Sequence, residues 1–203
     1  MLNETPHRRP NLAKPRYIKA NFVLSRGGVI AYPTESVYGL GCDPFDKVAV
    51  ARLLTIKQRL VGKGLIVVAA NIGQFLPWIA NLPPTLIDRL NQSWPGPITW
   101  VVPLDLMSQA FPYAPFPYWI TGDFDSVALR VSDHPIVRAL CEGYGGPLVS
   151  TSANLAGCQP LTTAIHVRQR LGRFIDNIVV GATGNNEKPT TIKDLLTGKI
   201  LRQ

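Results

Sequence analysis

The chain of 203 residues has few cysteines and no long apolar segment. Its three cysteines, Cys42, Cys141 and Cys158, are widely spaced and form no C-x-x-C pair. This argues against a disulfide scaffold and a cysteine zinc site, and it favours a reducing compartment. No apolar run approaches the roughly 18 residues of a membrane span, and no apolar segment follows the first basic residues as it would in a secretory signal. We therefore expect a cytoplasmic protein that makes no membrane contact.

Acidic residues are also scarce, since 13 Asp and Glu stand against 21 Lys and Arg, a net charge of +8. Residues 1–26 hold six basic residues and one acid, a net charge of +5, so the rest of the chain, with 15 basic and 12 acidic residues, carries only +3. This pattern fits attraction to tRNA or double-stranded RNA, and it fits a solvated basic leader equally well. Residues 1–15 show no hydrophobic periodicity, and we expect them to form a flexible leader before one domain at residues 16–203.

The hydrophobic residues, 46% of the chain, form short segments in which strand and helix patterns alternate. Strand patterns occur at residues 29–32, 64–70, 98–102, 127–131, 148–151 and 178–180, and helical patterns at residues 16–26, 46–56, 75–80, 86–91, 133–142 and 164–171. Asp46 and Asp133 are the predicted starts of two of these helices. Residues 111–119, rich in proline and aromatics, are predicted to form a surface loop. The alternation predicts an α/β fold with a twisted, mixed sheet.

Several common catalytic motifs are missing. There is no Walker loop and no G-x-S-x-G. Gly39-Leu40-Gly41 lacks the third glycine of a dinucleotide fingerprint, so we expect a tight turn there. His134 and His166 have no partner histidine at metal-ligand spacing and are predicted at helix ends or on the surface. Covalent catalysis and a protein-held metal are therefore not expected.

Three cations follow the helix that begins at Asp46. Lys57 and Arg59 would point the same way in an extended segment leaving the helix, and Lys63 could join them. Because three converging cations repel one another, an anion is their natural ligand. A solvated charged turn is the alternative for this motif taken alone.

Hydroxyl and amide side chains follow two predicted strands. Ser150-Thr151-Ser152-Ala153-Asn154 comes after one of them and Pro33-Thr34-Glu35-Ser36 after another. The carboxyl ends of strands are where open α/β sheets bind ligands, and these groups are neutral donors for phosphate and ribose. Arg130 lies among apolar strand residues and needs a partner, for which a substrate carboxylate would serve.

Four segments occur in an order that resembles the YrdC-like family. They are residues 31–41 (AYPTESVYGLG), 57–59 (KQR), 94–97 (WPGP) and 150–154 (STSAN). The resemblance covers about residues 16–203, and the family's lysine-x-arginine and serine-x-asparagine signature falls on Lys57, Arg59, Ser152 and Asn154. It implies a single α/β catalytic domain with a concave, positively charged face.

The resemblance also implies a reaction. Members of this family join L-threonine, bicarbonate and ATP into threonylcarbamoyl-adenylate and release pyrophosphate, the first step of tRNA t6A modification. Carried over by position, the residues expected to hold ATP are Lys57, Arg59, Ser152, Asn154 and Arg202, with Lys57 and Arg59 as the catalytic pair. Those expected around threonine are Thr34, Ser36, Lys63, Arg130, Ser150, Thr190 and Thr191. Mg²⁺ would be carried by ATP rather than by a protein cage, and the product would pass to the transferase TsaD with its partner subunits.

The sequence departs from the family pattern at two places and leaves two alternatives. Leu60 replaces the usual proline after Lys-x-Arg, and Ala156 replaces a common serine. One alternative is a non-catalytic factor that binds tRNA or ribosomal RNA with its basic face, which accounts for the charge but not for the signature. The other is carbamoyl transfer as in hydrogenase maturation, but those chains carry zinc fingers and an acylphosphatase domain that this chain lacks.

Overall fold

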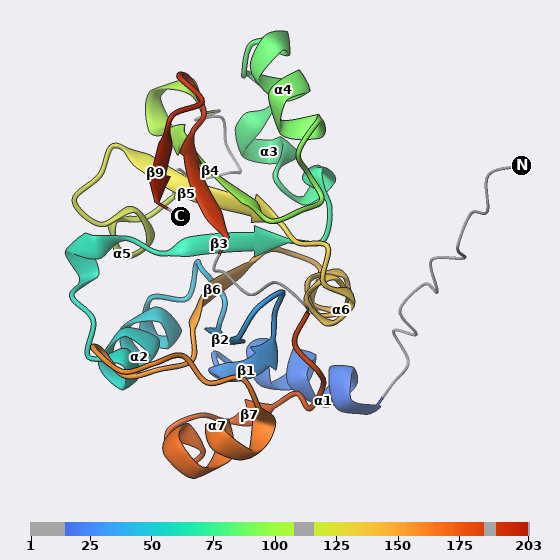
Figure 1. Cartoon of the computed structure of the whole chain (residues 1–203), viewed down its shortest axis with the longest axis vertical. Helices are drawn as coiled ribbons and strands as arrows, with labels where there is room; N and C mark the ends of the chain where they lie inside the picture. The colour runs from blue at the N-terminus through green and yellow to red at the C-terminus, as the bar shows by residue number, and fades with distance from the viewer. Residues whose placement is uncertain (1–14, 108–115, 185–189, 203) are drawn as a thin grey trace, which may run out of the picture.

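The computed structural model describes residues 15–107, 116–184 and 190–202, and within them nine strands form one sheet in the order β7-β1-β2-β6-β3-β5-β4-β8-β9. The strands are β1 Ile30–Pro33, β2 Tyr38–Gly41, β3 Ile66–Ala69, β4 Ile98–Pro103, β5 Ser126–Val131, β6 Leu148–Ser152, β7 Asn177–Ile178, β8 Thr191–Asp194 and β9 Ile200–Arg202. β3 and β5 pair in parallel, whereas β1 and β2 pair antiparallel. The predicted α/β fold with a mixed, twisted sheet is confirmed (Figure 1).

Helices cover both faces of this sheet (Figure 1). They are α1 Pro15–Leu24, α2 Lys47–Lys57, α3 Leu76–Ile79, α4 Pro84–Asn91, α5 Tyr118–Thr121, α6 Pro135–Tyr144 and α7 Ala164–Leu171. A 3₁₀ turn, η1 Val61–Lys63, follows α2. Each predicted helix is present, with ends that differ by a few residues. Asp46 caps α2 as expected, because its carboxylate accepts hydrogen bonds from the main-chain N–H groups of Val48 and Ala49.

The core has two parts because side chains alternate along each strand. On β3, Val67 belongs to the cluster that packs against α2, α3 and α4. Its neighbour Val68 belongs to a second cluster, on the opposite face, with α1 and α6. Burial on both faces explains why β3 is a continuous apolar run in the sequence.

Two local predictions are wrong. Gly39-Leu40-Gly41 is part of strand β2 rather than a tight turn. The glycines serve close packing there, since a Cβ on Gly41 would lie 2.4 Å from the carbonyl oxygen of Val149. Helix α6 begins one residue later than expected, and its N-cap is His134 rather than Asp133. The imidazole can accept the hydrogen bond from Ile136 N that a carboxylate usually accepts at this position.

Other predictions fall partly outside the described residues. The leader at residues 1–15 does so except for Pro15, which is the first residue of α1. The predicted loop at 111–119 is described only from Phe116, which is buried, and its end forms the start of α5. Strands β8 and β9 were not predicted. No helix in the described part of the chain is long and apolar enough to cross a membrane.

Candidate anion-binding active site

One cavity of about 990 Å³ brings together nearly all the site residues that the sequence predicts. Those that line it are Thr34, Ser36, Lys57, Arg59, Lys63, Arg130, Ser150, Ser152, Asn154, Thr190 and Arg202. Thr191 does not line it, whereas its strand neighbour Ile192 does, because successive residues of β8 point to opposite faces. The predicted residues therefore converge from six separate segments of the chain.

The cavity lies against one face of the sheet. On β5, Ser126, Ala128 and Arg130 line it, and the alternate residues of the same strand pack in the core under α2 to α4. On β6, Ser150, Thr151 and Ser152 all line it, and Val149 lies in the core. The period of two along β5 thus separates the polar cavity from the apolar core.

The charge of the cavity lining is strongly positive. Five cationic side chains line it, those of Lys57, Arg59, Lys63, Arg130 and Arg202, against one carboxylate among the described residues, that of Asp194. The Asp194 carboxylate accepts hydrogen bonds from the main-chain N–H and the hydroxyl of Thr197. These bonds, the main-chain one above all, lower the pKa of Asp194, which keeps it ionised. A cavity with this balance concentrates anions.

The end of helix α2 sets the direction of Lys57 and Arg59. Gln58 between them adopts a left-handed conformation with φ of 51°, which ends the helix. Arg59 Nη2 donates to the main-chain carbonyls of Lys63 and Gly64, at 3.0 and 2.8 Å. Its Nε is buried and has no hydrogen-bond partner. Burial and the nearby Arg202 lower the pKa of Arg59, so an anion bound there would relieve an existing repulsion.

Lys57 occupies the junction between α2 and the turn after β6. It is buried, and its Nζ donates to the main-chain carbonyls of Ser152 and Asn154 and to Asn154 Oδ1. An ammonium group has three donors, so all three are in use. Burial, and secondly Arg59, lowers the pKa of Lys57 to about 8. Lys57 therefore fixes the shape of this turn and adds positive charge beneath it.

Asn154 extends the same network into the following loop. Its Oδ1 accepts from Ser152 Oγ at 2.6 Å, and its Nδ2 donates to the main-chain carbonyls of Leu155 and Cys158. Three of the four signature residues are therefore bonded to one another. Arg59 makes no hydrogen bond to the other three, and its Nη2 donates instead to the carbonyls of Lys63 and Gly64.

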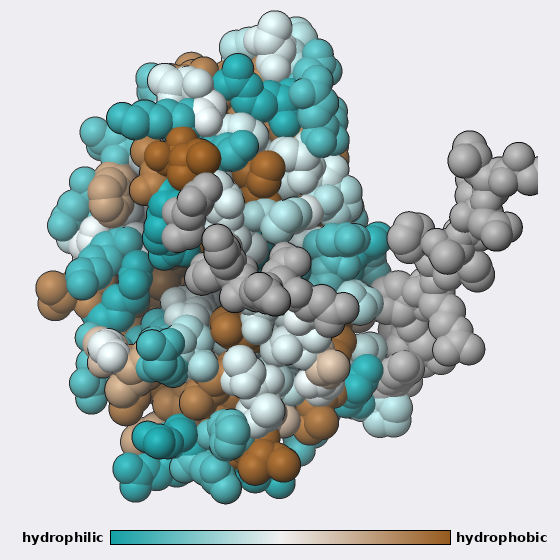
Figure 2. Space-filling model, in the orientation of Figure 1, coloured by the Kyte–Doolittle hydropathy of each residue, from teal (hydrophilic) through white to brown (hydrophobic). Residues whose placement is uncertain are grey.

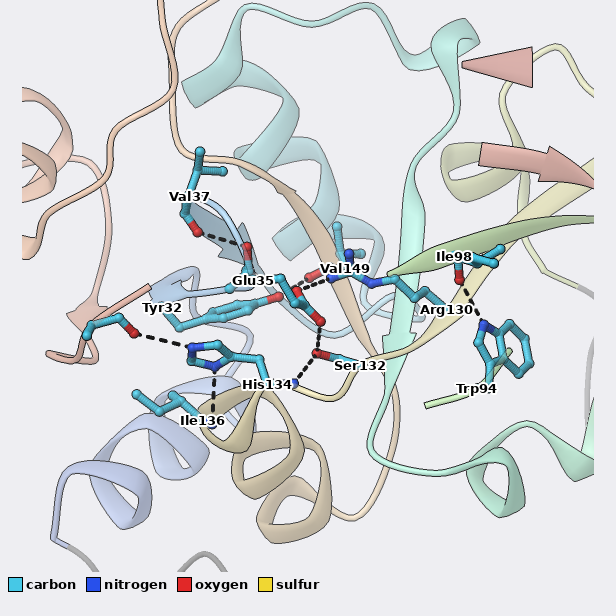
Figure 3. A network of polar contacts seen from close by, with 12 residues as sticks. Tyr32, Glu35, Val37, Trp94, Ile98, Arg130, Ser132, His134, Ile136 and Val149 are labelled. Carbon is cyan, nitrogen blue, oxygen red and sulfur yellow. Dashed lines mark hydrogen bonds and ion pairs between the residues drawn. The ribbon is translucent and has the colours of Figure 1, made fainter. Parts of the chain in front are cut away.

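Arg130 does have a partner within the protein. Its Nη2 lies 3.0 Å from Glu35 Oε2, and both side chains are about nine-tenths buried, at 7% and 10% exposure. The partner that the sequence requires for Arg130 is therefore Glu35, and a substrate carboxylate at Arg130 stays a prediction. Figure 3 shows Glu35 between Arg130 and Ser132, with His134 at the start of α6 beyond them.

Several residues that line the cavity were not predicted from the sequence. Phe124, Leu201 and Asp194 also line it, and Phe124 and Leu201 are more than half exposed, at 55% and 54%. Figure 2 shows hydrophobic surface over β9, next to hydrophilic side chains. The alternation of Ile192 and Asp194 on β8 was the available signal, and the short length of that strand concealed it. The cavity can thus hold a ligand that has an anionic part and an apolar part.

Comparison with known proteins agrees with this geometry. The Sua5/YciO/YrdC family, described as "Telomere recombination", matches residues 22–203. The chain belongs to this family. Among its relatives, the threonylcarbamoyl-AMP synthase of Cellvibrio japonicus is 48% identical over 188 residues, which cover 93% of this chain and 95% of the relative. That of Pseudomonas aeruginosa is 50% identical over 180 residues, 89% and 92% of the two chains.

Solved structures of this family share the fold. Sua5 of P. abyssi in complex with L-threonine aligns with a TM-score of 0.81 at 31% identity and covers 92% of this chain. This chain spans about half of that one, 53% of its length. YciO of E. coli aligns with a TM-score of 0.76 at 28% identity, and the alignment covers 92% of this chain and 88% of the YciO chain.

Proposed function

We infer that this protein is a threonylcarbamoyl-AMP synthase, which joins L-threonine, bicarbonate and ATP and releases pyrophosphate, the first step of tRNA t6A modification. The relatives named for this activity match nearly their whole length. The observation that carries the inference within this chain is the single cavity in which five cations and a row of hydroxyls converge with the four signature residues.

We propose the following assignment of substrates within the cavity. The triphosphate of ATP binds against Arg59 and Arg202, over the turn that Lys57 holds. Ser152 and Asn154 shape that turn and complete the ATP site. The carboxylate of threonine binds Arg130, and the candidates for its remaining polar groups are Thr34, Ser36, Lys63, Ser150 and Thr190. Thr191 does not line the cavity, so it would contribute only by pairing with β4 and thereby placing its neighbours on β8.

The chemistry suits such a site. The threonine amine takes up carbon dioxide derived from bicarbonate, and the resulting carbamate oxygen attacks the α-phosphate of ATP while pyrophosphate leaves. In-line displacement at phosphorus depends on positioning and on charge stabilisation more than on a covalent nucleophile. Arg59 and Arg202 would offset the charge that develops on the phosphates. Mg²⁺ would enter with ATP, held largely by phosphates and water.

The test is a pyrophosphate-release assay in which each substrate is withheld in turn, with the adenylate identified by mass spectrometry. We expect release that requires threonine, bicarbonate and ATP together. Release that ignores threonine, or no release, would contradict the proposal. Binding of tRNA without release would favour the alternative, a non-catalytic RNA-binding factor. Delivery of the adenylate to TsaD and its partner subunits is a further proposal, tested by adding those proteins and tRNA to the same reaction.

A further inference from the structure

Glu35 lies behind the cavity and does not line it. It follows β1, in the turn that leads to β2, and one of its carboxylate oxygens, Oε2, accepts from Arg130 Nη2 at 3.0 Å. The other, Oε1, accepts from Ser132 Oγ at 2.6 Å. Arg130 does line the cavity. Glu35 therefore contacts a cavity residue without lining the cavity itself, and Figure 3 shows its carboxylate between Arg130 and Ser132.

Arg130 keeps most of its donors free. A guanidinium has five N–H donors, and in the described residues only Nη2 of Arg130 has a hydrogen bond. Its Nε is buried with no partner. Because Nε is enclosed, the donors left for a ligand are those of Nη1 and the second N–H of Nη2. A carboxylate fits because its two oxygens match two parallel N–H groups of a guanidinium.

The carboxylate of Glu35, which binds Arg130, is held in place by further hydrogen bonds. Ser132 Oγ, which donates to Glu35, also accepts from His134 N at 3.2 Å. The imidazole of His134 caps α6 through Ile136 N, and its Nε2 lies 3.2 Å from the main-chain carbonyl oxygen of Ala182. Glu35 is thus connected to β5, to α6 and to the segment before β8. A carboxylate held at both oxygens leaves a paired arginine little rotational freedom.

We propose that Glu35 is a positioning residue for threonine recognition. By binding one N–H of Nη2, it orients the guanidinium of Arg130 so that Nη1 and the second N–H of Nη2 can bind the carboxylate of L-threonine. This rests on the proposed function, from which the threonine carboxylate is taken. A positioning role can be distinguished from a merely structural ion pair. If Glu35 positions Arg130, its loss should weaken threonine binding and leave ATP binding unchanged.

The experiment compares Glu35→Gln with wild type by calorimetric titration of L-threonine and, separately, of ATP. Glutamine keeps the shape, with an oxygen for Arg130 and an amide for Ser132, so the fold should persist. Replacing a charged acceptor by a neutral one should raise the Kd for threonine by about tenfold, since hydrogen bonds to charged groups are roughly twice as strong. The Kd for ATP should change by less than about twofold, because Glu35 lies outside the cavity. If Glu35→Gln does not fold, Glu35→Asp serves, as it keeps the charge but shortens the reach.

Two controls separate positioning from general destabilisation. Asp176→Asn weakens the more exposed ion pair with Arg52, for which the Nη1 to Oδ2 distance is 2.6 Å, and should leave the Kd for threonine unchanged. In an Arg130→Ala background, Glu35→Gln should cause no further rise in that Kd, because it acts only through Arg130.

Three outcomes would overturn the inference. They are an unchanged Kd for threonine in Glu35→Gln, equal losses for threonine and ATP, and a loss that persists in the Arg130→Ala background. Absence of threonine binding to wild type would overturn it as well. Threonine binding that depends on Glu35 in a protein that makes no adenylate would support the inference and contradict the proposed function, so the two failures are distinguishable.

Discussion

The ammonium group of Lys57 hydrogen-bonds Asn154 Oδ1 at 3.1 Å, although the two residues are 97 positions apart in the chain. The end of α2 and the turn after β6 are thereby joined at the floor of the cavity. Because Nζ also donates to two main-chain carbonyls of that turn, Lys57 has no donor left for a ligand unless the turn rearranges. Of the paired cations, Arg59 is then the better placed to contact phosphate.

This division of roles predicts the effect of Arg59→Ala. Adenylate formation should fall by about 10²-fold or more, the scale seen when one preorganised transition-state donor is removed. The fold should survive, since Arg59 lies on the exit from α2 and not in the core. Pyrophosphate release measured with saturating threonine checks this. Arg173→Ala is the matched control, because Arg173 stacks on Phe174 away from the cavity and should keep wild-type turnover.

Lys57 should give the protein a distinctive dependence of stability on pH. Its pKa falls from 10.5 to about 8 on folding, chiefly because it is buried. Between these two values the unfolded chain binds more protons than the folded protein, so the free energy of unfolding gains a contribution that rises with pH. Below about pH 8 the cost of burying the charge is fully present.

Lys57→Met is the variant that reveals this contribution. Methionine removes three donated hydrogen bonds and leaves the main-chain carbonyl of Asn154 without a donor among the described residues, a loss that does not depend on pH. Ser152 O keeps the N–H of Asn154, and Asn154 Oδ1 keeps the hydroxyl of Ser152. The difference in unfolding free energy, wild type minus Lys57→Met, should therefore increase between pH 8 and pH 10 in urea denaturation. A difference that stays flat or decreases between pH 8 and pH 10 would show that folding does not lower the pKa of Lys57. Tyrosines that titrate in the same range cancel in the difference.

Local signals predicted the fold well, whereas pairings between distant segments escaped them. The cap at Asp46 and the apolar spacing after it define α2, so the position of Lys57 and Arg59 at its end followed from the sequence. The ion pair of Glu35 with Arg130 joins residues 95 apart and leaves no periodic pattern. The sequence could show that Arg130 needs a partner but not which residue supplies it.

The strands near the C-terminus escaped prediction for a different reason. β8 has four residues and β9 three, both too short for a clear alternation. Their pairing with β4 and with each other determines their structure, and it brings Thr190 and Arg202 to the cavity. The family resemblance supplied these two residues where local patterns did not.

Replacement of all three cysteines by alanine should leave catalysis nearly intact. Cys42 and Cys141 are buried, and burial raises the pKa of both thiols, which makes them unreactive. Cys158 is exposed, but Asn154 contacts its main-chain carbonyl, which alanine retains. The expected cost is a stability loss of about 1 kcal/mol for each buried site. Inactivation of wild type by a thiol reagent, with the triple variant resistant and the fold intact, would contradict this.

Deletion of residues 1–14 should spare adenylate synthesis, because helix α1 begins at Pro15 and no cavity residue among those described precedes Thr34. The deletion removes Arg8, Arg9 and Lys14. If the protein binds tRNA, its affinity should fall. The slope of log K against log salt concentration should also become shallower by roughly 0.7 to 0.9 for each lost phosphate contact. Filter binding at several salt concentrations, beside the pyrophosphate assay, tests both. Loss of synthesis in a folded deletion variant would place this segment in the active site.

The departure from the family at Leu60 predicts a stabilising substitution. Leu60 is 73% exposed and has φ of −65° and ψ of 137°, the backbone conformation that proline adopts. In the described residues its N–H makes no hydrogen bond, so proline would remove none. Leu60→Pro should therefore raise the free energy of unfolding by about 0.4 to 1 kcal/mol, because it restricts the unfolded chain. Urea denaturation measures the change, and Leu60→Ala, which shortens the side chain without fixing φ, is the control. A destabilised Leu60→Pro variant would mean that Arg59 cannot keep its conformation before a proline, and its turnover would then fall as well.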